Sequence, residues 1–528
     1  MSQDNIFPME EHQDEIHSDA FQSLSDSDQA SIYNVENLDN PNLINNNQTL
    51  NNPNFINSTP INTNVIQDPP RTSNVNQNSS EIHVDNILPP ETKRFRKPIN
   101  YHEALLAQAD DDVPNDYKDI EGRHDASLWY QAVQNELSSI HENQTWSIQE
   151  APPNRKIVKC RWVFRIKRHS DGSVARYKAR LVAKGYSQVP GQDFSETYAP
   201  VAKYKSLRTM LSIAASRDYE IEQMDVVTAF LIPSLKEEVY MEIPSGVAHD
   251  NKSGMVCKLN KALYGLRQSP RVWYEELHTF LISIGLTPTI ADPCLYTGLN
   301  CYLSIYVDDI IIAAPKDIAS DIKKKISSRF QSTDLGPIQH CLGLKVQRNR
   351  IERRLYLSQS RLAEHLLKET KMENSRFVKT PLDPNVILKR ENATIKAQIN
   401  DIPYRSIIGT LHHLAMCTRP DLANAVGILS RFQEGPSTVH LTALKHVLQY
   451  LNATKHYGLK LGGSSLTLSG YADADWAGDL DSRRSTSGYC FFLGDACINW
   501  CSKLQASVAL SSCEAEYVSL SLATQEAI

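Results

Sequence analysis

Apolar and polar positions follow regular patterns along most of the chain, and one strongly apolar run breaks its own pattern. Residues 303–314 (LSIYVDDIIIAA) are largely β-branched or aromatic, which is typical of a buried strand, except for the adjacent Asp308 and Asp309. Burying a carboxylate costs free energy unless it is paired or bound to a metal, and two adjacent carboxylates also repel each other. We therefore expect a tight hairpin with both aspartates at its tip, facing a divalent cation. The alternative is a solvated Asp-Asp turn.

Helices and strands are predicted for much of the remaining chain after residue 100. Apolar residues three or four positions apart predict helices at 127–140, 204–217, 316–330, 360–370 and over most of 404–451, with one more starting within 258–271 and another near Ser512. Alternation predicts strands at 159–167, 176–185, 342–347, 354–357, 466–471, 488–493 and 498–501. In the run 219–231, Asp225 ends a strand-like stretch and is the candidate for a third carboxylate. Sequence alone does not place Asp225 beside Asp308.

Two of these strands form a predicted basic hairpin. Basic and apolar residues alternate in 159–167 and in 176–185, and Asp171-Gly172-Ser173 between them is a hairpin-turn signal. Residues 151–188 contain eleven lysines and arginines and one aspartate. We interpret the hairpin as a finger that contacts phosphates, and a solvated basic face is the alternative.

Charge is distributed unevenly along the chain. The net charge of −6 combines −12 in residues 1–90 and −6 in residues 91–150 with +12 in residues 151–528. A basic body with an acidic front end is the polarity expected of a nucleic-acid-binding protein with an acidic tail.

The front of the chain has the composition of a disordered segment, and we predict disorder over residues 1–98. Between Asn34 and Asn78, sixteen of 45 residues are asparagine, too polar a stretch to offset its chain entropy by burial. The basic cluster Lys93–Pro98 closes this tail. It is either a nuclear address or phosphate-binding arm, or a solvated linker.

The sequence also indicates a compartment. The first 30 residues are acidic and carry no apolar signal segment, and no apolar run approaches the roughly 18 residues of a membrane span. The ten cysteines form no CxxC pairs, as expected of free thiols in a reducing compartment. We expect an intracellular protein that is not secreted and not bound to a membrane.

A series of short motifs, in a fixed order, resembles the reverse transcriptase of copia-type LTR retrotransposons. The motifs are KARLVAKG (178–185), QMDV with TAFL (223–231), LYGLRQSPR (263–271), YVDD (306–309), DLG (334–336), YRSIIGTL (404–411), TRPDL (418–422), ADADWAGD (472–479), STSGY (485–489) and ALSSCEAEY (509–517). The resemblance covers roughly residues 127–528, and the number of motifs in one order makes it specific.

The resemblance implies an α+β fold with a right-hand polymerase of fingers, palm and thumb. The polymerase would occupy residues 99–385, after the disordered tail 1–98. A helical connection would follow at 386–465, and a truncated RNase H-like α/β module at 466–528.

By the same resemblance, Asp225, Asp308 and Asp309 would be the catalytic carboxylates of the palm. Asp225 and Asp308 would be direct ligands of two Mg²⁺ ions, for which Mn²⁺ can substitute, and Asp309 would support them. One ion would activate the primer 3′-hydroxyl, and the other would hold the triphosphate and the leaving pyrophosphate.

The family pattern also assigns the nucleotide-binding residues. Lys178 and Arg180 would reach the triphosphate, and Phe230 would crowd the 2′ position and exclude ribonucleotides. Tyr264 and Gly265 would line the nucleotide pocket.

The last segment resembles an RNase H module, which needs four acidic residues around two Mg²⁺ ions. Asp473 and Glu514 match the first two, with Asp475 and Glu516 as neighbouring alternatives. The other two carboxylates would lie beyond Ile528. We therefore expect a remnant without RNase H activity.

The expected function is thus an RNA-directed DNA polymerase that acts on an RNA or DNA template with a primer, using dNTPs and Mg²⁺. It would work in the cytoplasm, in a virus-like particle, or in the nucleus, and its oligomeric state is left open. Two departures from the family pattern support an alternative, a decayed, non-enzymatic nucleic-acid-binding remnant. Val227 replaces a lysine, and Ile232-Pro233 replaces an Asn-Gly turn, so the loop after Asp225 is expected to be altered.

Overall fold

The computed structural model describes residues 6–8, 113–168, 173–247, 254–390 and 402–528, with only the backbone described for 6–8. All of these residues belong to one compact unit, and a second unit, Val35–Asn100, lies outside the described residues. The predicted disorder of the tail, the basic cluster Lys93–Pro98 and the turn residues 171–172 also fall outside them.

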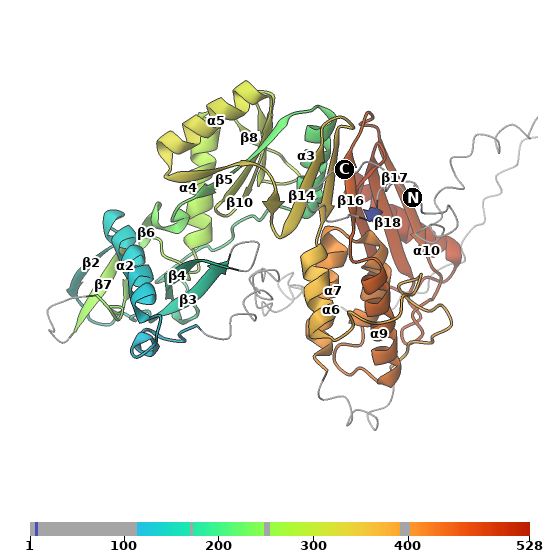
Figure 1. The fold of residues 1–528 in the computed structure, drawn as a ribbon, viewed down its shortest axis with the longest axis horizontal. Helices are drawn as coiled ribbons and strands as arrows, with labels where there is room; N and C mark the ends of the chain where they lie inside the picture. The colour runs from blue at the N-terminus through green and yellow to red at the C-terminus, as the bar shows by residue number, and fades with distance from the viewer. Residues whose placement is uncertain (1–5, 9–112, 169–172, 248–253, 391–401) are drawn as a thin grey trace, which may run out of the picture. The chain divides into compact units, whose positions relative to one another are not determined.

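A six-stranded antiparallel sheet lies at the centre of the first half of the described chain (Figure 1). Its order is β12 (Ser332–Pro337), β5 (Glu220–Val226), β11 (Asp309–Ala314), β10 (Cys301–Tyr306), β9 (Leu295–Gly298) and β8 (Thr287–Pro288). Side chains alternate between its faces, as the period of two requires. Ile310 and Ile312 pack with helices α4 (Ser269–Ser283) and α5 (Lys316–Arg329), whereas Ile311 packs with helix α3 (Tyr204–Ser216).

A second group of elements carries the basic hairpin. The hairpin is β3 (Cys160–Arg168) and β4 (Val174–Ala183), and beside it lies a sheet in the order β2 (Trp146–Glu150), β7 (Met255–Lys261), β6 (Ser234–Met241). Helix α2 (Ala126–Glu142) covers the apolar face of the hairpin, where its Trp129 and Val133 share a core with Trp162 and Leu181. Short 3₁₀ helices lie at Tyr117–Ile120 and Gly185–Ser187. The predicted strand alternation is confirmed here, because one face is buried and the other polar.

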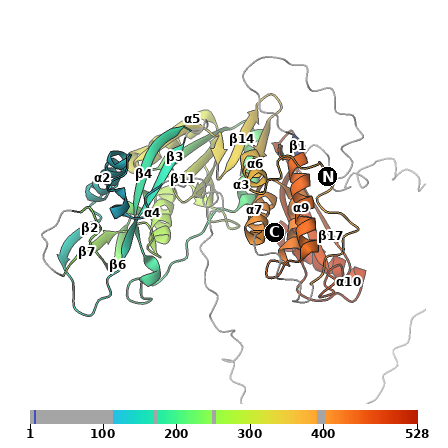
Figure 2. The same cartoon turned by 60° about the horizontal axis from the view of Figure 1, so that its bottom comes forward.

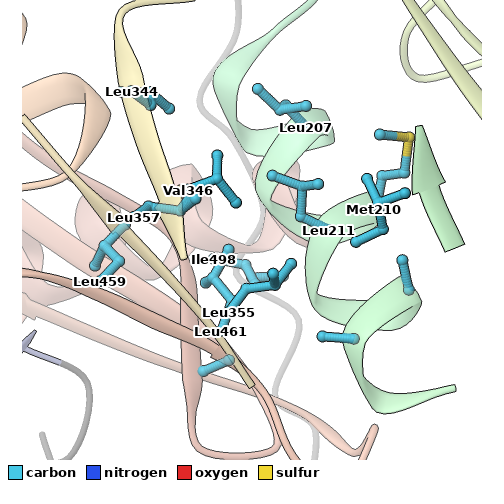
Figure 3. Packing of buried hydrophobic residues seen from close by; sticks show 14 of the residues in the cluster. Leu207, Met210, Leu211, Leu344, Val346, Leu355, Leu357, Leu459, Leu461 and Ile498 are labelled. Carbon is cyan, nitrogen blue, oxygen red and sulfur yellow. The ribbon is translucent and has the colours of Figure 1, made fainter. Parts of the chain in front are cut away.

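A five-stranded sheet packs against the other side of helix α3. Its order is β1 (Ile6–Pro8), β16 (Tyr457–Gly462), β15 (Arg354–Ser358), β14 (Leu344–Asn349) and β13 (His340–Cys341). Figure 3 shows Leu207 and Leu211 of α3 facing Val346 of β14, Leu355 of β15 and Leu461 of β16 in one buried cluster. Helix α3 is therefore held between two sheets.

The remaining elements are a helical group and a C-terminal sheet, visible in Figure 2. The helical group consists of α6 (Ser360–Glu369), α7 (Tyr404–Cys417), the 3₁₀ helix Pro420–Leu422, α8 (Ala423–Ser430) and α9 (Thr438–Ala453). The C-terminal sheet has the order β17 (Leu468–Ala474), β18 (Thr486–Leu493), β19 (Ala496–Leu504), and α10 (Ser512–Ala527) packs on β17 and β18. No helix in the described ranges combines the length and the hydrophobicity that a membrane span requires.

One sequence-based prediction about an element needs correction. The segment 258–271 was expected to form the start of a helix, but helix α4 begins only at Ser269, near the end of that segment. Lys258 and its neighbours instead pair with β2 and β6 in β7, and Gly265 adopts a positive φ of +91° that interrupts a helix. Strand β12 was not predicted, because its residues are mostly polar and it forms through pairing with β5.

Candidate active site

The YVDD motif forms the hairpin that its apolar flanks predict. Strands β10 and β11 pair in register up to Tyr306 and Asp309, so only Val307 and Asp308 connect them. Val307 has a φ of +60°, a left-handed conformation that β-branched residues rarely adopt and that a two-residue turn of this kind normally gives to glycine. The prediction of a tight hairpin is confirmed, with Asp308 in the turn and Asp309 as the first residue of β11.

Asp225 lies on the neighbouring strand, close to this turn. Strand β5 pairs with β11 so that Asp225 is directly opposite Asp309. The amide of Val226 donates a hydrogen bond to the Asp308 carbonyl at 2.9 Å, which ties the turn to the end of β5. Burial, and secondarily the negative charge of Asp308, raise the pKa of the Asp225 carboxyl. The two carboxylates are thus near enough to repel each other, although 83 residues separate them.

The Asp309 carboxylate has different neighbours. Its Oδ1 accepts a hydrogen bond from Gln223 Nε2 at 3.3 Å. Its charge also contributes to raising the pKa of the Cys341 thiol to about 12, after the larger effect of burial. The Asp309 carboxylate is therefore held from the side of β5, whereas the charge of Asp308 acts on Asp225.

Six cationic side chains share one face of the β3–β4 hairpin. Directly opposite residues of an antiparallel pair point to the same face, and the register places Arg165 opposite Lys178 and Lys167 opposite Arg176. The six residues of this cationic face are Arg161, Arg165, Lys167, Arg176, Lys178 and Arg180. Like charges directly opposite each other destabilise a hairpin, so the cationic face is suited to an anionic ligand.

The electrostatics connect this cationic face to the aspartates. The charges of Lys178, Arg180 and Arg176 lower the pKa of Asp225, against the effects of burial and Asp308. Burial, and then the neighbouring cations, lower the pKa of Lys178 to about 8. An anionic ligand such as a phosphate would offset the excess positive charge of the cationic face, whereas a divalent cation would offset the excess negative charge of Asp225 and Asp308.

Aromatic side chains form a wall beside the cationic face. The Arg180 guanidinium lies 4.7 Å from the centroid of the Tyr264 ring, and the Tyr264 ring meets the Phe230 ring edge-on at 4.9 Å. Phe230 is on the 3₁₀ helix Ala229–Leu231, directly after the loop that follows Asp225. Burial raises the pKa of the Tyr264 hydroxyl to about 12, so it stays protonated at neutral pH.

Gly265 allows the backbone of this wall to touch the hairpin. The Ala183 amide donates a hydrogen bond to the Tyr264 carbonyl at 2.8 Å. A Cβ atom on Gly265 would lie 2.1 Å from the Ala183 carbonyl oxygen, and the φ of +91° is itself unfavourable for other residues. The glycine is required here by a close approach of two backbones.

Glu136 is a site residue that the sequence interpretation missed. It is only 9% exposed on helix α2, and its Oε1 accepts a hydrogen bond from the Leu181 amide at 3.3 Å. Burial raises its pKa, while the charges of Arg180 and Lys178 lower it. The sequence spacing could have revealed this residue, because Glu136 falls at helical spacing on the same buried face as Val133 and Ile140.

The aspartates meet part of what a metal site needs. No group of three or more His, Cys, Asp or Glu side chains positioned for a metal ion occurs among the described residues. Asp225 and Asp308 nevertheless provide two hard oxygen donors whose repulsion a divalent cation would offset, which is the donor set that Mg²⁺ prefers. These two residues fit a Mg²⁺ ion, and Asp309 is not gathered with them.

The acidic residues of the C-terminal module are arranged differently. Asp473 is on β17, and its carbonyl accepts a hydrogen bond from the Ser519 hydroxyl at 2.6 Å. The Glu514 carboxylate accepts from the Leu510 amide at 2.6 Å, before the start of α10. The Asp475 carboxylate accepts from the Thr486 amide at 2.6 Å. Asp475 and Glu514 each bind backbone close to their own element, and Glu516 is exposed on α10.

Comparisons with known proteins agree with these observations. Residues 143–384 match the family described as reverse transcriptase (RNA-dependent DNA polymerase). The chain is 42% identical over 430 residues to the retrovirus-related Pol polyprotein from transposon TNT 1-94 of Nicotiana tabacum, covering 80% of this chain and 32% of that protein. It is also 42% identical over 405 residues to the corresponding polyprotein from transposon RE1 of Arabidopsis thaliana, covering 75% of this chain and 27% of the relative. The chain thus spans about a third of the length of these relatives.

A shorter relative is matched in full. The putative transposon Ty5-1 protein of Saccharomyces cerevisiae is 32% identical over 311 residues, covering 57% of this chain and 100% of the relative. Among solved structures, the foamy viral protease-reverse transcriptase in complex with RNA/DNA hybrid matches with a TM-score of 0.43 and 13% identity, covering 75% of this chain and 46% of that one. That structural similarity is too low to add to the sequence matches.

Proposed function

The chain belongs to the reverse transcriptase family of copia-type retrotransposon Pol proteins, and on this premise we propose that it is an RNA-directed DNA polymerase. It would transfer nucleotides from dNTPs to a primer 3′-hydroxyl on an RNA or DNA template. One observation carries the proposal: Asp225 and Asp308, from different segments, come close enough to interact in reach of the charges on the cationic face. An acidic group beside a basic one is what phosphoryl transfer needs, because its catalysis rests on positioning and charge neutralisation.

We assign the parts of a right-hand polymerase to the elements as follows. The six-stranded sheet with α3, α4 and α5 corresponds to the palm, and α2 with the β3–β4 hairpin and the β2–β7–β6 sheet to the fingers. The five-stranded sheet and the helices α6 to α9 would supply the thumb and connection, and residues 466–528 the RNase H-like module. The proposed boundary at residue 385 runs through the five-stranded sheet, since β16 pairs with β15.

Asp225 and Asp308 would hold Mg²⁺, and Asp309 would support them from the first position of β11. When bound, the ions would supply charge neutralisation and an activated 3′-hydroxyl at the reacting phosphate. The protein's own contribution is positioning. The pairing of β5 with β11 and the bond from Val226 to the Asp308 carbonyl fix the spacing of the two carboxylates.

The incoming nucleotide would lie between the cationic face and the aromatic wall. Lys178 and Arg180 would contact the triphosphate, and the ring of Tyr264 keeps the Arg180 guanidinium in place from the side. Phe230, packed edge-on against Tyr264, would occupy the space that a ribose 2′-hydroxyl needs. Gly265 would line the pocket beside Tyr264, where its lack of a side chain lets the wall touch the Ala183 backbone.

The altered loop after Asp225 leads into a short 3₁₀ helix, Ala229–Leu231. Thr228 adopts a left-handed φ of +53°, the 3₁₀ helix follows, and the Pro233 carbonyl accepts a hydrogen bond from the Ala262 amide at 3.0 Å. Phe230 therefore reaches Tyr264 despite Ile232-Pro233. This supports the enzyme over the alternative, a decayed remnant that binds nucleic acid without incorporating nucleotides.

Primer extension on the purified chain tests the proposal. An oligo(dT) primer on poly(rA), with dTTP and Mg²⁺, should be extended by the wild-type chain and not by D308N. Primer–template binding, measured by fluorescence anisotropy, should be similar for both. Binding without extension by a folded wild-type chain would reject the polymerase and favour the remnant.

A further inference from the structure

The carbonyl oxygens of both turn residues in the YVDD motif accept hydrogen bonds from outside the hairpin. The Val226 amide binds the Asp308 carbonyl, as described above. The indole Nε1 of Trp273 donates to the Val307 carbonyl at 2.7 Å. The second bond is the shorter one, and it comes from helix α4, on the face of the sheet opposite α3.

Trp273 is held firmly by its surroundings. It is 2% exposed, and its ring meets Phe330 edge-on at 5.4 Å within the core formed with Leu277, Ile305 and Ile310. An indole N–H that is buried needs an acceptor, so its bond could be only the satisfaction of a core tryptophan. The acceptor, the carbonyl of Val307, indicates that this hydrogen bond also holds the turn.

The acceptor belongs to a residue in an unfavourable conformation. Val307 has a φ of +60°, a conformation that is unfavourable for a β-branched residue and persists only where the surroundings impose it. Its carbonyl precedes Asp308 directly in the chain. If the bond from Trp273 were lost, the turn could relax, and the Asp308 carboxylate would move with it.

Trp273 also connects the turn to the aromatic wall. It lies on the first turns of α4, which begins at Ser269 just after Tyr264 and Gly265. One continuous segment thus carries the proposed nucleotide wall at one end and the anchor of the aspartate turn at the other. A displacement of that segment would be transmitted to both.

We infer that Trp273 is a positioning residue for Asp308: its indole N–H holds the carbonyl of the strained Val307 and so fixes the Asp308 carboxylate near Asp225. The inference rests on the proposed polymerase function for its effect on catalysis. Its structural part, that Trp273 holds the turn, stands independently of that function.

The test compares W273F with a matched control, W500F. The Trp500 indole also donates to a backbone carbonyl, that of Ala415 at 2.8 Å, but joins β19 to α7. Both substitutions remove one indole–carbonyl bond and a similar volume. W273F should lower kcat for primer extension about 10- to 100-fold, since small misplacement of a catalytic group has effects of this size, with KM for dTTP changed less than about 3-fold. W500F should stay within about 3-fold of wild type in both constants.

A rescue variant separates turn strain from lost packing. Glycine adopts the left-handed conformation without cost, so V307G should make the turn less dependent on the indole. In the presence of V307G, W273F should lower kcat less than about 5-fold relative to V307G alone. An equal loss with and without V307G would overturn the strain argument.

Two measurements need no catalysis. Mn²⁺ binding, followed by the EPR signal of the free ion, should be weakened in W273F and unchanged in W500F. Amide hydrogen exchange of the peptide covering 303–312 should be faster in W273F alone.

If the wild type fails to extend primers, the proposed function fails, and the exchange experiment still decides whether Trp273 holds the turn. If W273F and W500F exchange alike in this peptide, the inference is overturned.

Discussion

The chain carries two groups of acidic residues at the edges of sheets, and they differ in what surrounds each carboxylate. Asp225 and Asp308 come from separate segments, the charge of Asp308 contributes to raising the pKa of Asp225, and Asp225 lies within reach of the charges on the cationic face. In the C-terminal module, Asp473 is exposed, and the carboxylates of Asp475 and Glu514 accept hydrogen bonds from nearby backbone amides. The negative charges of Asp225 and Asp308 therefore repel each other, whereas the carboxylates of Asp475 and Glu514 already have hydrogen-bond partners in the protein.

This difference distinguishes a site from a structural use of the same residue type. Carboxylates that cap a turn or a helix stabilise their own element by about 0.5–2 kcal/mol. Carboxylates that repel each other destabilise the fold, and such an arrangement is typical of places where a ligand or ion completes the charge balance. We therefore expect the two groups to respond in opposite ways to substitution.

The largest contrast is expected between D225N and D473N. D225N should reduce primer extension about 10³-fold, equivalent to about 4 kcal/mol, because it removes a charge from the proposed metal site. D473N should change extension less than about 2-fold, within the range of a surface substitution. Steady-state kinetics on the same primer–template measures both.

Stability provides the control for this contrast. The raised pKa of Asp225 means that its ionised form opposes folding at pH 7, and that this cost fades as the pH falls through the folded-state pKa. D225N should therefore melt at the same or a higher temperature than wild type at pH 7. A large fall in its melting temperature would show that lost activity came from misfolding.

A smaller effect is expected from the cation that faces the first pair. With the pKa of Lys178 near 8, its positive charge is present at pH 7 and is lost progressively as the pH rises towards 9. The kcat/KM for the nucleotide should fall about 10-fold over this interval, since this ratio reports the free enzyme. K178R, which stays charged, should lose less than about 3-fold in the same assay. Identical profiles for the two proteins would assign the pH dependence to another group.

No effect is expected in the second group. The chain should leave the RNA of a labelled RNA/DNA hybrid intact in the presence of Mg²⁺, and D473N should behave identically. Gel analysis of the labelled RNA would detect cleavage. Metal-dependent cleavage that D473N abolishes would remove the distinction between the two groups of carboxylates.

Local patterns in the sequence predicted the elements whose pairing is also local. The period of two in the basic hairpin gave the correct faces, because β3 and β4 are neighbours in sequence and one face is buried. Helix α3 was expected at 204–217 and occurs at Tyr204–Ser216, since its apolar stripe packs against two sheets. The turn at Asp308 followed from the cost of burying two charges.

Pairings between segments that are distant in the chain could not be predicted from the sequence. Nothing local places β5 next to β11, so the register of Asp225 opposite Asp309 required the structure. The indole bond of Trp273 and the burial of Glu136 beneath Leu181 likewise depend on which helix covers which strand. Such contacts are set by tertiary packing, which propensity and spacing do not encode.

The like-charge pairs of the cationic face have a consequence for how the protein responds to ionic strength. Arg165 opposite Lys178 and Lys167 opposite Arg176 repel each other in the free protein, and dissolved salt screens charges over about 10 Å at 0.1 M. The same salt weakens the attraction of a cationic surface for nucleic acid. Added salt should thus make the free hairpin more stable while it makes the complex weaker, so that buffers chosen for storage and for activity will differ.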